Sequence, residues 1–548
     1  MVAPNSFNTF PMTKAEKSKL RGDLFRHLDG IVTAPTAYTL HENGVLNFIL
    51  ENEKTTLSSI TEKFKANEGY LNVALRVLAS QGWLDYEILD GDNISVQSNE
   101  KSKIAFDLIP LYKDVVDLMT LSEKYHQRKF EKEPFLVLEK IFNKYRENYG
   151  VSLSDAPLVR EIQEQVLKHI EGHIVGPTLV ALGMGGMFHK YFMEASFRPE
   201  EFHKDADSFS RLLDFFVFLG WFNKKNETYS FTDKGFFFAK RASAYGVTVS
   251  YLPAFRKVKE LIFGQPDIFW NLPTGAKEIH VDRAMNVWGS GGAHSTYFKV
   301  IDEVVIDLFN KPIDEQPKGI LDMGCGNGAF IIHLFDVIEN HTLRGTMLEE
   351  HPLFLVGADY NTAALKVTRA NIIQADIWAK VIFGDIGRPD LLADDLEENY
   401  GIQLGDLLNV RTFLDHNRIY NEAKVKTPGR ISASSGAYAF RGQRISNADI
   451  EDSLREHLLN WAPYVEKFGL LVIELHTISP KHTCKNLGRT AATAYDATHG
   501  FSDQYIVEIE VFNKMAKEAG LHPVEAHFRR FPDSELGTVS INLLRANQ

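Results

Sequence analysis

The sequence predicts an α/β fold in which a Rossmann-like core is preceded by a large, mostly helical domain with a duplicated winged-helix-like unit. Three observations support this prediction. The chain has 548 residues, which is more than one ordinary hydrophobic core organises. Two stretches of the first half resemble each other. From about residue 270 onward, short apolar runs alternate with helical stretches, as in βαβ units with a parallel sheet.

Composition limits the environments expected for the chain. Charged residues make up 24%, as in ordinary globular proteins, and no apolar run reaches the roughly 18 residues of a membrane helix. Cys325 and Cys484 are the only cysteines and the N-terminus has no signal-peptide pattern, so we expect a reducing, cytoplasmic location. The net charge of -12 opposes binding to a phosphate backbone. Neither nucleic acid nor a membrane is therefore expected as a partner.

One segment of the first half occurs twice. The stretch "HLDGIVTAPTAY" begins at His27, and "HIEGHIVGPTLV" begins at His169. The positions that match at one constant offset are Gly30, Pro35 and Gly44 in the first stretch and Gly172, Pro177 and Gly186 in the second. Each copy continues into an apolar helical pattern that ends at a Gly-Trp pair, which suits a glycine just after a helix C-terminus. These pairs are Gly82-Trp83 and Gly220-Trp221.

Helices followed by a small β-ribbon are typical of winged-helix units. Such units bind DNA in some proteins and serve only packing or dimerisation in others. The acidic charge favours the second role, so we expect a lid or dimerisation domain and a homodimer. The predicted divisions are winged-helix-like repeats at 1–100 and 161–268, connecting helices at 101–160, and the α/β core at 269–548.

Five strands are predicted in the core, at "KGILDMG", "LFLVGADY", "KVIFGDI", "GDLLNVRTFLD" and "GLLVIELHT". A helix should follow, with Ser502 as its N-cap and Gly520 as its stop, and two antiparallel strands should close the chain. Ligands of open α/β sheets bind beyond the carboxyl ends of the strands. Functional residues are therefore expected just after each strand.

The glycine-rich stretch "GILDMGCGNGAF" follows the first of these strands. Gly324, Gly326 and Ala329 fit the dinucleotide spacing G-x-G-x-x-A. Asp322, however, would face a pyrophosphate across a short gap, and like charges repel. The next acidic strand end, Asp359, also lies farther on than the roughly 20 residues of a dinucleotide site. The loop thus favours a ligand that carries an ammonium and a sulfonium group.

Imidazoles, carboxylates and an amide converge beyond the later strands. The fourth strand runs out at Arg411, Asp415, His416 and Arg418, the fifth ends at His476, and the connection that follows carries His482, His499 and Gln504. Histidines with oxygen ligands suit a mononuclear Mn or Fe ion. Such an ion stabilises an enolate as a Lewis acid. Histidines that form ordinary hydrogen bonds without a metal explain the same pattern, and the sequence leaves both interpretations open.

The pattern D-x-G-x-G-x-G followed by an acidic strand end resembles motifs I and II of class I S-adenosylmethionine-dependent methyltransferases. The resemblance implies that Asp322 and the backbone of Gly324, Gly326 and Gly328 hold the methionine part of the methyl donor. It also implies that Asp359 binds the ribose and that Asp385 contacts the adenine. We assign Tyr360, Gly291 and His294 to the same donor site.

A second resemblance rests on "HVDRAMNVWGSGGAHSTYF", "RTFLDHNR" and "DATHGFSDQY". With the helical first half, these stretches resemble the metal-dependent C-methyltransferase domains at the start of certain polyketide synthases. Those domains methylate malonyl units on a phosphopantetheine arm. The resemblance implies His499 and Gln504 as metal ligands, and we add His476 from its strand-end position. The expected catalytic residues are Arg411, Asp415 and His416.

Several alternatives stay open from the sequence. The acceptor is either a malonyl unit on a carrier protein or a free 2-oxo acid. The reaction is either metal-assisted C-methylation or a metal-free O-methylation in which His416 or His476 is the general base. A regulator that senses S-adenosylmethionine is the non-enzymatic alternative. The segment around Arg430, Arg441 and Arg444 is either a loop or a lid that grips an anion.

Overall fold

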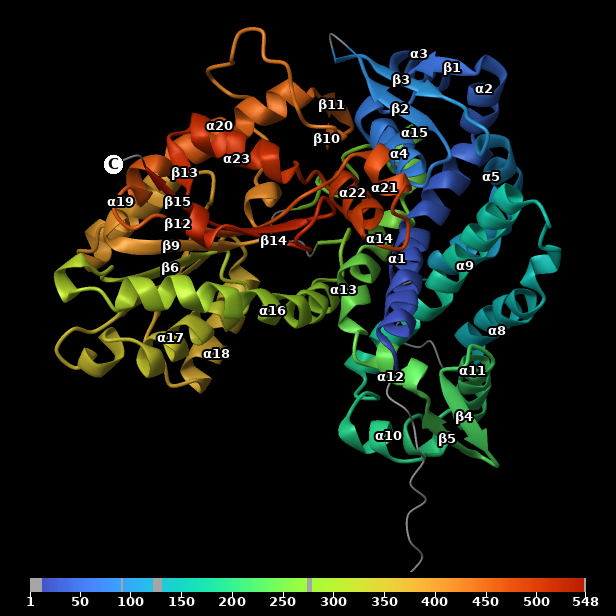
Figure 1. Cartoon of the computed structure of the whole chain (residues 1–548), viewed down its shortest axis with the longest axis horizontal. Helices are drawn as coiled ribbons and strands as arrows, with labels where there is room; N and C mark the ends of the chain where they lie inside the picture. The colour runs from blue at the N-terminus through green and yellow to red at the C-terminus, as the bar shows by residue number, and fades with distance from the viewer. Residues whose placement is uncertain (1–11, 90–91, 122–130, 274–277, 547–548) are drawn as a thin grey trace, which may run out of the picture.

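The computed structural model describes residues 12–89, 92–121, 131–273 and 278–546, and all of their side chains except those of 292–296. A helical half and an α/β half lie side by side (Figure 1). The predicted fold class is confirmed, because the second half holds a seven-strand path of class I methyltransferase topology behind a helical first half. No helix in the described ranges is long and apolar enough to cross a membrane.

The first half is built around two long helices, α1 (Lys14–Glu42) and α9 (Pro157–Met184). They cross where the duplicated segments meet. A Cβ on Gly30 would collide with the backbone of His169, and a Cβ on Gly172 would collide with the backbone of His27. Each His-x-x-Gly motif therefore packs its glycine on the histidine of the other copy, and the duplicated glycines fix the distance between the helices.

Each long helix leads into a smaller unit that ends in a β-hairpin. The first unit contains α2 (Val45–Asn52), β1 (Lys54–Thr56), α3 (Leu57–Phe64), α4 (Glu68–Ser80), β2 (Asp85–Ile88) and β3 (Ile94–Gln97). The second contains α10 (Lys190–Glu194), α11 (Ala206–Phe218), β4 (Phe222–Lys225) and β5 (Thr228–Phe231). Gly82 and Gly220 follow α4 and α11 with φ of 80° and 74°, a backbone shape that favours glycine. The tryptophans that follow them are buried.

Shorter helices connect these units to each other and to the second half. They are α5 (Ser102–Leu108), α6 (Lys113–Met119), α8 (Lys132–Arg146), α12 (Asp233–Ala239), α13 (Ser243–Ser250), α14 (Leu252–Phe255) and α15 (Val258–Phe263). The long helix α16 (Arg283–Phe309) then leads into the α/β half. It crosses α13 at Gly246 and Gly289, where a Cβ on Gly246 would lie 2.5 Å from the Cα of Gly289.

The sheet of the second half runs in the order β13-β15-β12-β9-β6-β7-β8. Its strands are β6 (Gly319–Met323), β7 (Phe354–Asp359), β8 (Lys380–Phe383), β9 (Leu407–Thr412), β12 (Leu470–Leu475), β13 (Leu521–Pro523) and β15 (Val539–Ala546), with β14 (Arg529–Phe531) paired to β15. Strands β6, β7, β8, β9 and β12 are parallel, and β15 is antiparallel to β12. The chain order reverses between β6 and β9, so the crevice expected in such a sheet opens at their carboxyl ends.

Most helices of the second half cover the sheet, two pack against α1 and α4 of the helical half, and a small hairpin stands apart. The helices are α17 (Ala329–His341), α18 (Thr362–Gln374), α19 (Pro389–Tyr400), α20 (Asn447–Val465), α21 (Pro480–Cys484), α22 (Ala492–Gly500) and α23 (Ile509–Glu518). The hairpin consists of β10 (Tyr438–Phe440) and β11 (Gln443–Ile445).

The helix predicted to begin at Ser502 begins instead at Ile509. Ser502 donates its hydroxyl hydrogen to the Thr498 carbonyl, so it closes the preceding helix and is not an N-cap. The residues between run along the ends of β9 and β12, where the Tyr505 amide donates to the His416 carbonyl (2.8 Å). These tertiary hydrogen bonds override the local helical signal. The predicted stop is correct, because Gly520 follows α23 with φ of 80°.

The crossing of α1 and α9 gives a stability prediction. Replacing Gly172 with alanine should lower the free energy of unfolding by about 1–3 kcal/mol, since the new methyl group has no room against His27. Gly405→Ala is the matched control, because a Cβ there would lie 3.8 Å from the nearest atom, the Tyr464 carbonyl oxygen. Chemical denaturation of both variants measures the difference. Equal stabilities would contradict the packing described.

Candidate functional site

The glycine-rich loop leaves β6 and enters α17 through three residues with positive φ. Gly324, Gly326 and Gly328 have φ of 81°, 55° and 79°, in the left-handed region that favours glycine. The amides of Gly324 and Cys325 donate to the Ala358 carbonyl, at 2.7 and 3.1 Å. The loop is thereby fastened to the end of the neighbouring strand β7.

Two carboxylates lie beneath this loop. Asp322 is 1% exposed, and its Oδ1 has no hydrogen-bond partner among the described residues. Burial, followed by the nearby charge of Asp359, raises the pKa of Asp322 to about 8. Asp359 accepts hydrogen bonds from the amides of Gly326 (3.0 Å) and Asn361 (2.8 Å). A buried, unpaired carboxylate beside a second acid is stabilised by a cationic ligand, which fits the donor predicted from the sequence.

An aromatic pair stands at the outer end of the same edge. Tyr360 and Phe383 are 60% and 56% exposed, and their ring centroids lie 5.4 Å apart. Exposed aromatic faces of this kind suit stacking against a purine. Asp385 follows β8 and accepts from the Gly387 amide at 2.8 Å. The sequence prediction included Tyr360 and Asp385 but missed Phe383, which reads as an ordinary strand residue.

Two further residues of the predicted donor site come from α16. Gly291 is exposed, and a Cβ there would meet no atom within 4 Å, so packing does not require glycine at this position. His294 lies outside the residues whose side chains the structure describes.

The donor loop borders a second cluster through Leu414. A Cβ on Gly324 would lie 2.8 Å from Leu414, which precedes Asp415 and His416 at the end of β9. His416 Nδ1 is hydrogen-bonded to the carboxylate of Glu474, and the His416 amide also donates to it (3.2 Å). Glu474 is 2% exposed within β12. Glu474 was not predicted from the sequence, because it lies inside an apolar strand run rather than after it.

His499 lies against His416, with ring centroids 4.9 Å apart. Its Nδ1 donates to the Tyr495 carbonyl (2.7 Å), which leaves Nε2 as the ring atom with a lone pair. Burial, followed by the charge of His416, lowers the pKa of His499 to about 3, so this imidazole stays neutral. No described residue bonds to Nε2 of either ring.

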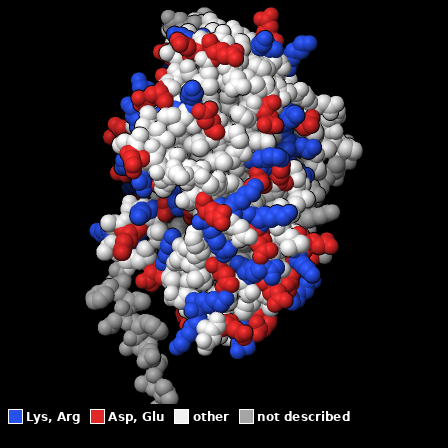
Figure 2. Space-filling view, turned by 90° about the vertical axis from the view of Figure 1, so that its right-hand side faces the viewer, with Lys and Arg blue, Asp and Glu red and all other residues white. Residues whose placement is uncertain are grey.

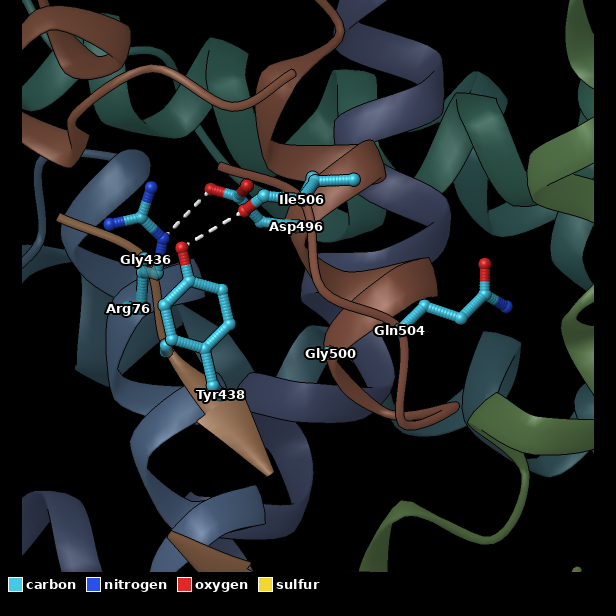
Figure 3. A pocket seen from close by; sticks show the side chains of 8 residues that line it. Arg76, Gly436, Tyr438, Asp496, Gly500, Gln504 and Ile506 are labelled. Atoms are coloured by element: carbon cyan, nitrogen blue, oxygen red, sulfur yellow. Dashed lines mark hydrogen bonds and ion pairs between the residues drawn. The ribbon is translucent and has the colours of Figure 1, made fainter. Parts of the chain in front are cut away.

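Gln504 lies in the extended segment after α22. Its Nε2 donates to the Tyr251 hydroxyl (2.9 Å) and to Ser502 Oγ (3.0 Å), which leaves the amide oxygen unused. A small cavity beside it is lined by Arg76, Gly436, Ala437, Tyr438, Asp496, Gly500, Gln504 and Ile506 (Figure 3). Tyr251 comes from the helical half, so both halves contribute to this region.

His476, a predicted metal ligand, does not share the geometry of His499. Its Nδ1 is hydrogen-bonded to the Val507 carbonyl (3.0 Å), and its Nε2 to Ser540 Oγ (2.7 Å). Neither ring nitrogen is left for a metal. His476 instead joins β12 to its neighbours, and we exclude it from the ligand set.

Arg411 and Asp415, predicted as catalytic, form a separate buried cluster. They pair with each other, and the Asp415 carboxylate also bonds to His457 Nε2 (2.9 Å). The Arg411 guanidinium lies 4.1 Å from the ring centroid of Trp461 in α20. Arg411 is 1% exposed. The side chains of His416 and Asp415 therefore lie in different clusters. Of the three predicted catalytic residues, only His416 packs against His499.

The arginines expected to grip an anion are all paired with carboxylates of this chain. Arg430 pairs with Asp452 (3.0 Å), Arg441 with Asp503 (2.9 Å) and Arg444 with Asp92 (2.7 Å). These ion pairs give the segment 430–444 the role of a strap that joins α20, the end of α22 and the first half.

Three family models match the chain. Residues 278–542 match the methyltransferase model described as "AprA MT2-like domain", 171–265 match "AprA winged helix domain", and 20–86 match "AprA N-terminal domain". No curated protein matches the sequence.

Solved structures with similar architecture include three methyltransferases. The mitomycin 7-O-methyltransferase MmcR has 12% identity over 71% of this chain and 98% of its own, with a TM-score of 0.41. The CurJ carbon methyltransferase has 10% identity over 82% and 99%, with a TM-score of 0.33. Human N-acetylserotonin methyltransferase in complex with SAM has 12% identity over 73% and 100%, with a TM-score of 0.38. With the matched methyltransferase domain and the acidic glycine loop, the chain is an S-adenosylmethionine-dependent methyltransferase.

The raised pKa of Asp322 predicts a pH-dependent affinity for the donor. A cationic ligand favours the ionised carboxylate, so binding to the ligand-free enzyme should tighten by up to about tenfold per pH unit between pH 6 and 8, then level off. Asp322→Asn should bind more weakly and lack this dependence. Isothermal titration of both proteins across pH 6–9 measures the ratio of affinities, in which titration of the ligand itself cancels. A constant ratio would contradict the assignment.

The same carboxylate predicts an unusual stability effect. The folded-state pKa of about 8 lies above the value of about 4 in unfolded chains, so the native state loses stability as pH rises between these values. Without ligand, Asp322→Asn should therefore melt at a higher temperature than the native protein at pH 8 and at a similar temperature at pH 4. Thermal denaturation at both pH values checks this. A variant that melts lower at pH 8 would show that Asp322 has a stabilising partner.

Proposed function

We propose that this S-adenosylmethionine-dependent methyltransferase methylates the carbon of an enolisable dicarbonyl compound, with the assistance of a mononuclear Mn or Fe ion. The acceptor we favour is a malonyl unit on an acyl carrier protein in polyketide-type biosynthesis. The observation that carries the proposal is the cluster of His416, His499 and Gln504 beside the donor loop. In this cluster, three potential ligand or base atoms have no partner among the described residues.

The donor set fits a metal ion that keeps open positions. His499 is neutral, and its Nδ1 is held by a backbone carbonyl, the usual arrangement of a metal-binding imidazole. Gln504 presents an amide oxygen because both hydrogen bonds of its side chain are made by nitrogen. The described residues contain no group of three or more His, Cys, Asp or Glu that could hold a metal. One imidazole and one amide oxygen would leave the other coordination positions to substrate oxygens.

When bound, the ion would act as a Lewis acid that lowers the pKa of the carbon acid. His416 would remove the proton from that carbon with Nε2, because Glu474 holds Nδ1 and stabilises the imidazolium that forms. Asp322 and the loop glycines would hold the donor so that its methyl group faces the cluster. Tyr251 of the helical half would keep Gln504 in place and help to exclude water.

A free 2-oxo acid is the alternative acceptor, since it enolises in the same way. We also propose that the protein forms a homodimer through the helical half and that it does not bind nucleic acid. On the face of the helical half in Figure 2, Lys and Arg side chains are interspersed with Asp and Glu. Binding to a phosphate backbone is favoured by a continuous basic surface, and this face offers none.

The direct test supplies S-adenosylmethionine and Mn or Fe with a malonyl-loaded carrier protein or with 2-oxo acids, and weighs the products. We expect a mass gain of one or two methyl groups on carbon, and loss of the reaction after chelation. His499→Ala and Gln504→Ala should each lower Mn affinity by about 10–100-fold or more. His482→Ala is the matched control, because His482 lies in the same connection and its ring pairs with the exposed Glu535. Full activity of metal-free protein would contradict metal assistance.

A metal-free O-methylation is the second candidate. The His416–Glu474 pair favours it, because this pair is a general base that needs no metal. Glu474→Gln should reduce kcat by about 10²–10⁴-fold in either reaction, with little change in the affinity for S-adenosylmethionine. The position of the new methyl group, read by NMR with a ¹³C-labelled donor, separates the two reactions. Unchanged kcat in Glu474→Gln would exclude the pair from both.

A further inference from the structure

We propose that Arg76, in the helical half, is a positioning residue of the active site, and that it acts through Asp496 on the helix that carries His499. The residue lies on α4, more than 400 positions before His499 and Gln504. This goes beyond the proposed function, because any reaction that uses His499 and Gln504 depends on where α22 and the segment after it are held.

The helix α4 lies along α22 and touches it at three levels. At one end, a Cβ on Gly500 would lie 2.7 Å from Val73, so the helices meet at the residue next to His499. In the middle, Arg76 Nε donates to Asp496 Oδ2 (3.0 Å). At the far end, Gln81 Nε2 donates to Thr493 Oγ1 (2.9 Å). The spacing of these contacts follows one face of each helix.

The guanidinium of Arg76 uses its donors on three separate segments of the second half. Besides Asp496, Nη2 donates to Thr477 Oγ1 and to the Ile478 carbonyl, both at 2.9 Å, and Nη1 donates to the Ser435 carbonyl. Thr477 itself donates to Asp496 Oδ1 at 2.5 Å. One side chain thus joins the end of β12, the segment before β10 and the helix α22.

Burying the Arg76–Asp496 ion pair has a cost in desolvation free energy. Arg76 is 1% exposed and Asp496 is 6% exposed. Taking two charges out of water is costly, and apolar side chains of similar size often stabilise a protein as well or better. In Figure 3, Arg76 faces Asp496 at one side of the small cavity, and the side chain of Gln504, which also lines the cavity, points away from this pair. The pair therefore holds one side of a cavity that is also lined by the segment that carries Gln504.

Arg76 lines this cavity and also binds two residues that line a larger one. The open cavity has a volume of about 500 Å³, and its lining includes Ser435 and Thr477, two of the groups that Arg76 binds. The segments 433–438 and 504–510 each contribute residues to the lining of both cavities. Removing the guanidinium would release the segments that line the two cavities and would free α22 to shift.

The test compares Asp496→Asn, Arg76→Gln and the double variant with Thr493→Val. The last removes a buried hydrogen bond between the same two helices but touches neither charge. Thermal melting, the Kd for S-adenosylmethionine, Mn affinity and kcat are measured for each. We expect kcat to fall at least tenfold in Asp496→Asn and in the double variant, with the Kd for S-adenosylmethionine within twofold. The double variant should melt above Arg76→Gln, because no buried charge is left unpaired. Thr493→Val should resemble the native protein.

Recovery of both melting temperature and kcat in the double variant would overturn the proposal, because the pair would then serve stability alone. An equal loss of kcat in Thr493→Val would overturn it too. If Arg76→Gln fails to fold, the kcat of Asp496→Asn alone tests the proposal, since asparagine keeps the size and the Thr477 contact of the native residue. The metal hypothesis is judged separately. If the native protein is active without Mn or Fe, that hypothesis fails, and the kcat comparison still tests Arg76.

Discussion

The carboxylate of Asp322 is buried at the end of β6, and its Oδ1 has no partner among the described residues. The candidate donor site is organised around this carboxylate. The loop above it contains three residues with positive φ, so only glycines make this close turn without strain. Placing a buried acid beside Asp359 costs stability in the ligand-free protein. A cationic ligand offsets that cost, and a pyrophosphate would increase it. The sign of the charge on the ligand therefore separates this site from a dinucleotide site with the same glycine spacing.

The helical half contributes side chains to the candidate site, where Tyr251 bonds to Gln504 and Arg76 bonds to Asp496. Its two long helices are held at close range by the reciprocal Gly30–His169 and Gly172–His27 contacts. That rigid pair supports α4, which lies along α22, and the connected α14 region, which supplies Tyr251 to Gln504. Positioning of the His499 region therefore depends on contacts across the whole chain.

Much of the fold could be predicted from the sequence, because its signals are local. The strand ends at Asp322 and Asp359 and the glycine stops after α4 and α11 depend on neighbouring residues alone. The misplaced start of α23 has the opposite cause: the segment after Ser502 is held extended by long-range bonds such as Tyr505 to His416. A helical pattern does not reveal a partner about 90 residues away.

The candidate site was predicted less completely, for the same reason. His416 was recognisable as a polar residue after a strand, and the resemblance to known C-methyltransferase domains implied His499 and Gln504 as metal ligands. Glu474 was not, because it points to its partner from inside a strand, and Arg76 was not, because nothing near it marks its use. His476 met the strand-end criterion, but both of its nitrogens bond within the sheet. A position just after a strand places a residue at the carboxyl edge of the sheet. It does not determine the direction in which the side chain points.

A crystal structure of the protein with S-adenosylmethionine tests the central claim most directly. The account predicts that the ammonium or sulfonium group of the donor lies within hydrogen-bonding or ion-pairing distance of Asp322, with the ribose hydroxyls on Asp359 and the methyl group directed toward His416. A donor bound elsewhere, or one that leaves Asp322 buried and without a contact, would contradict it.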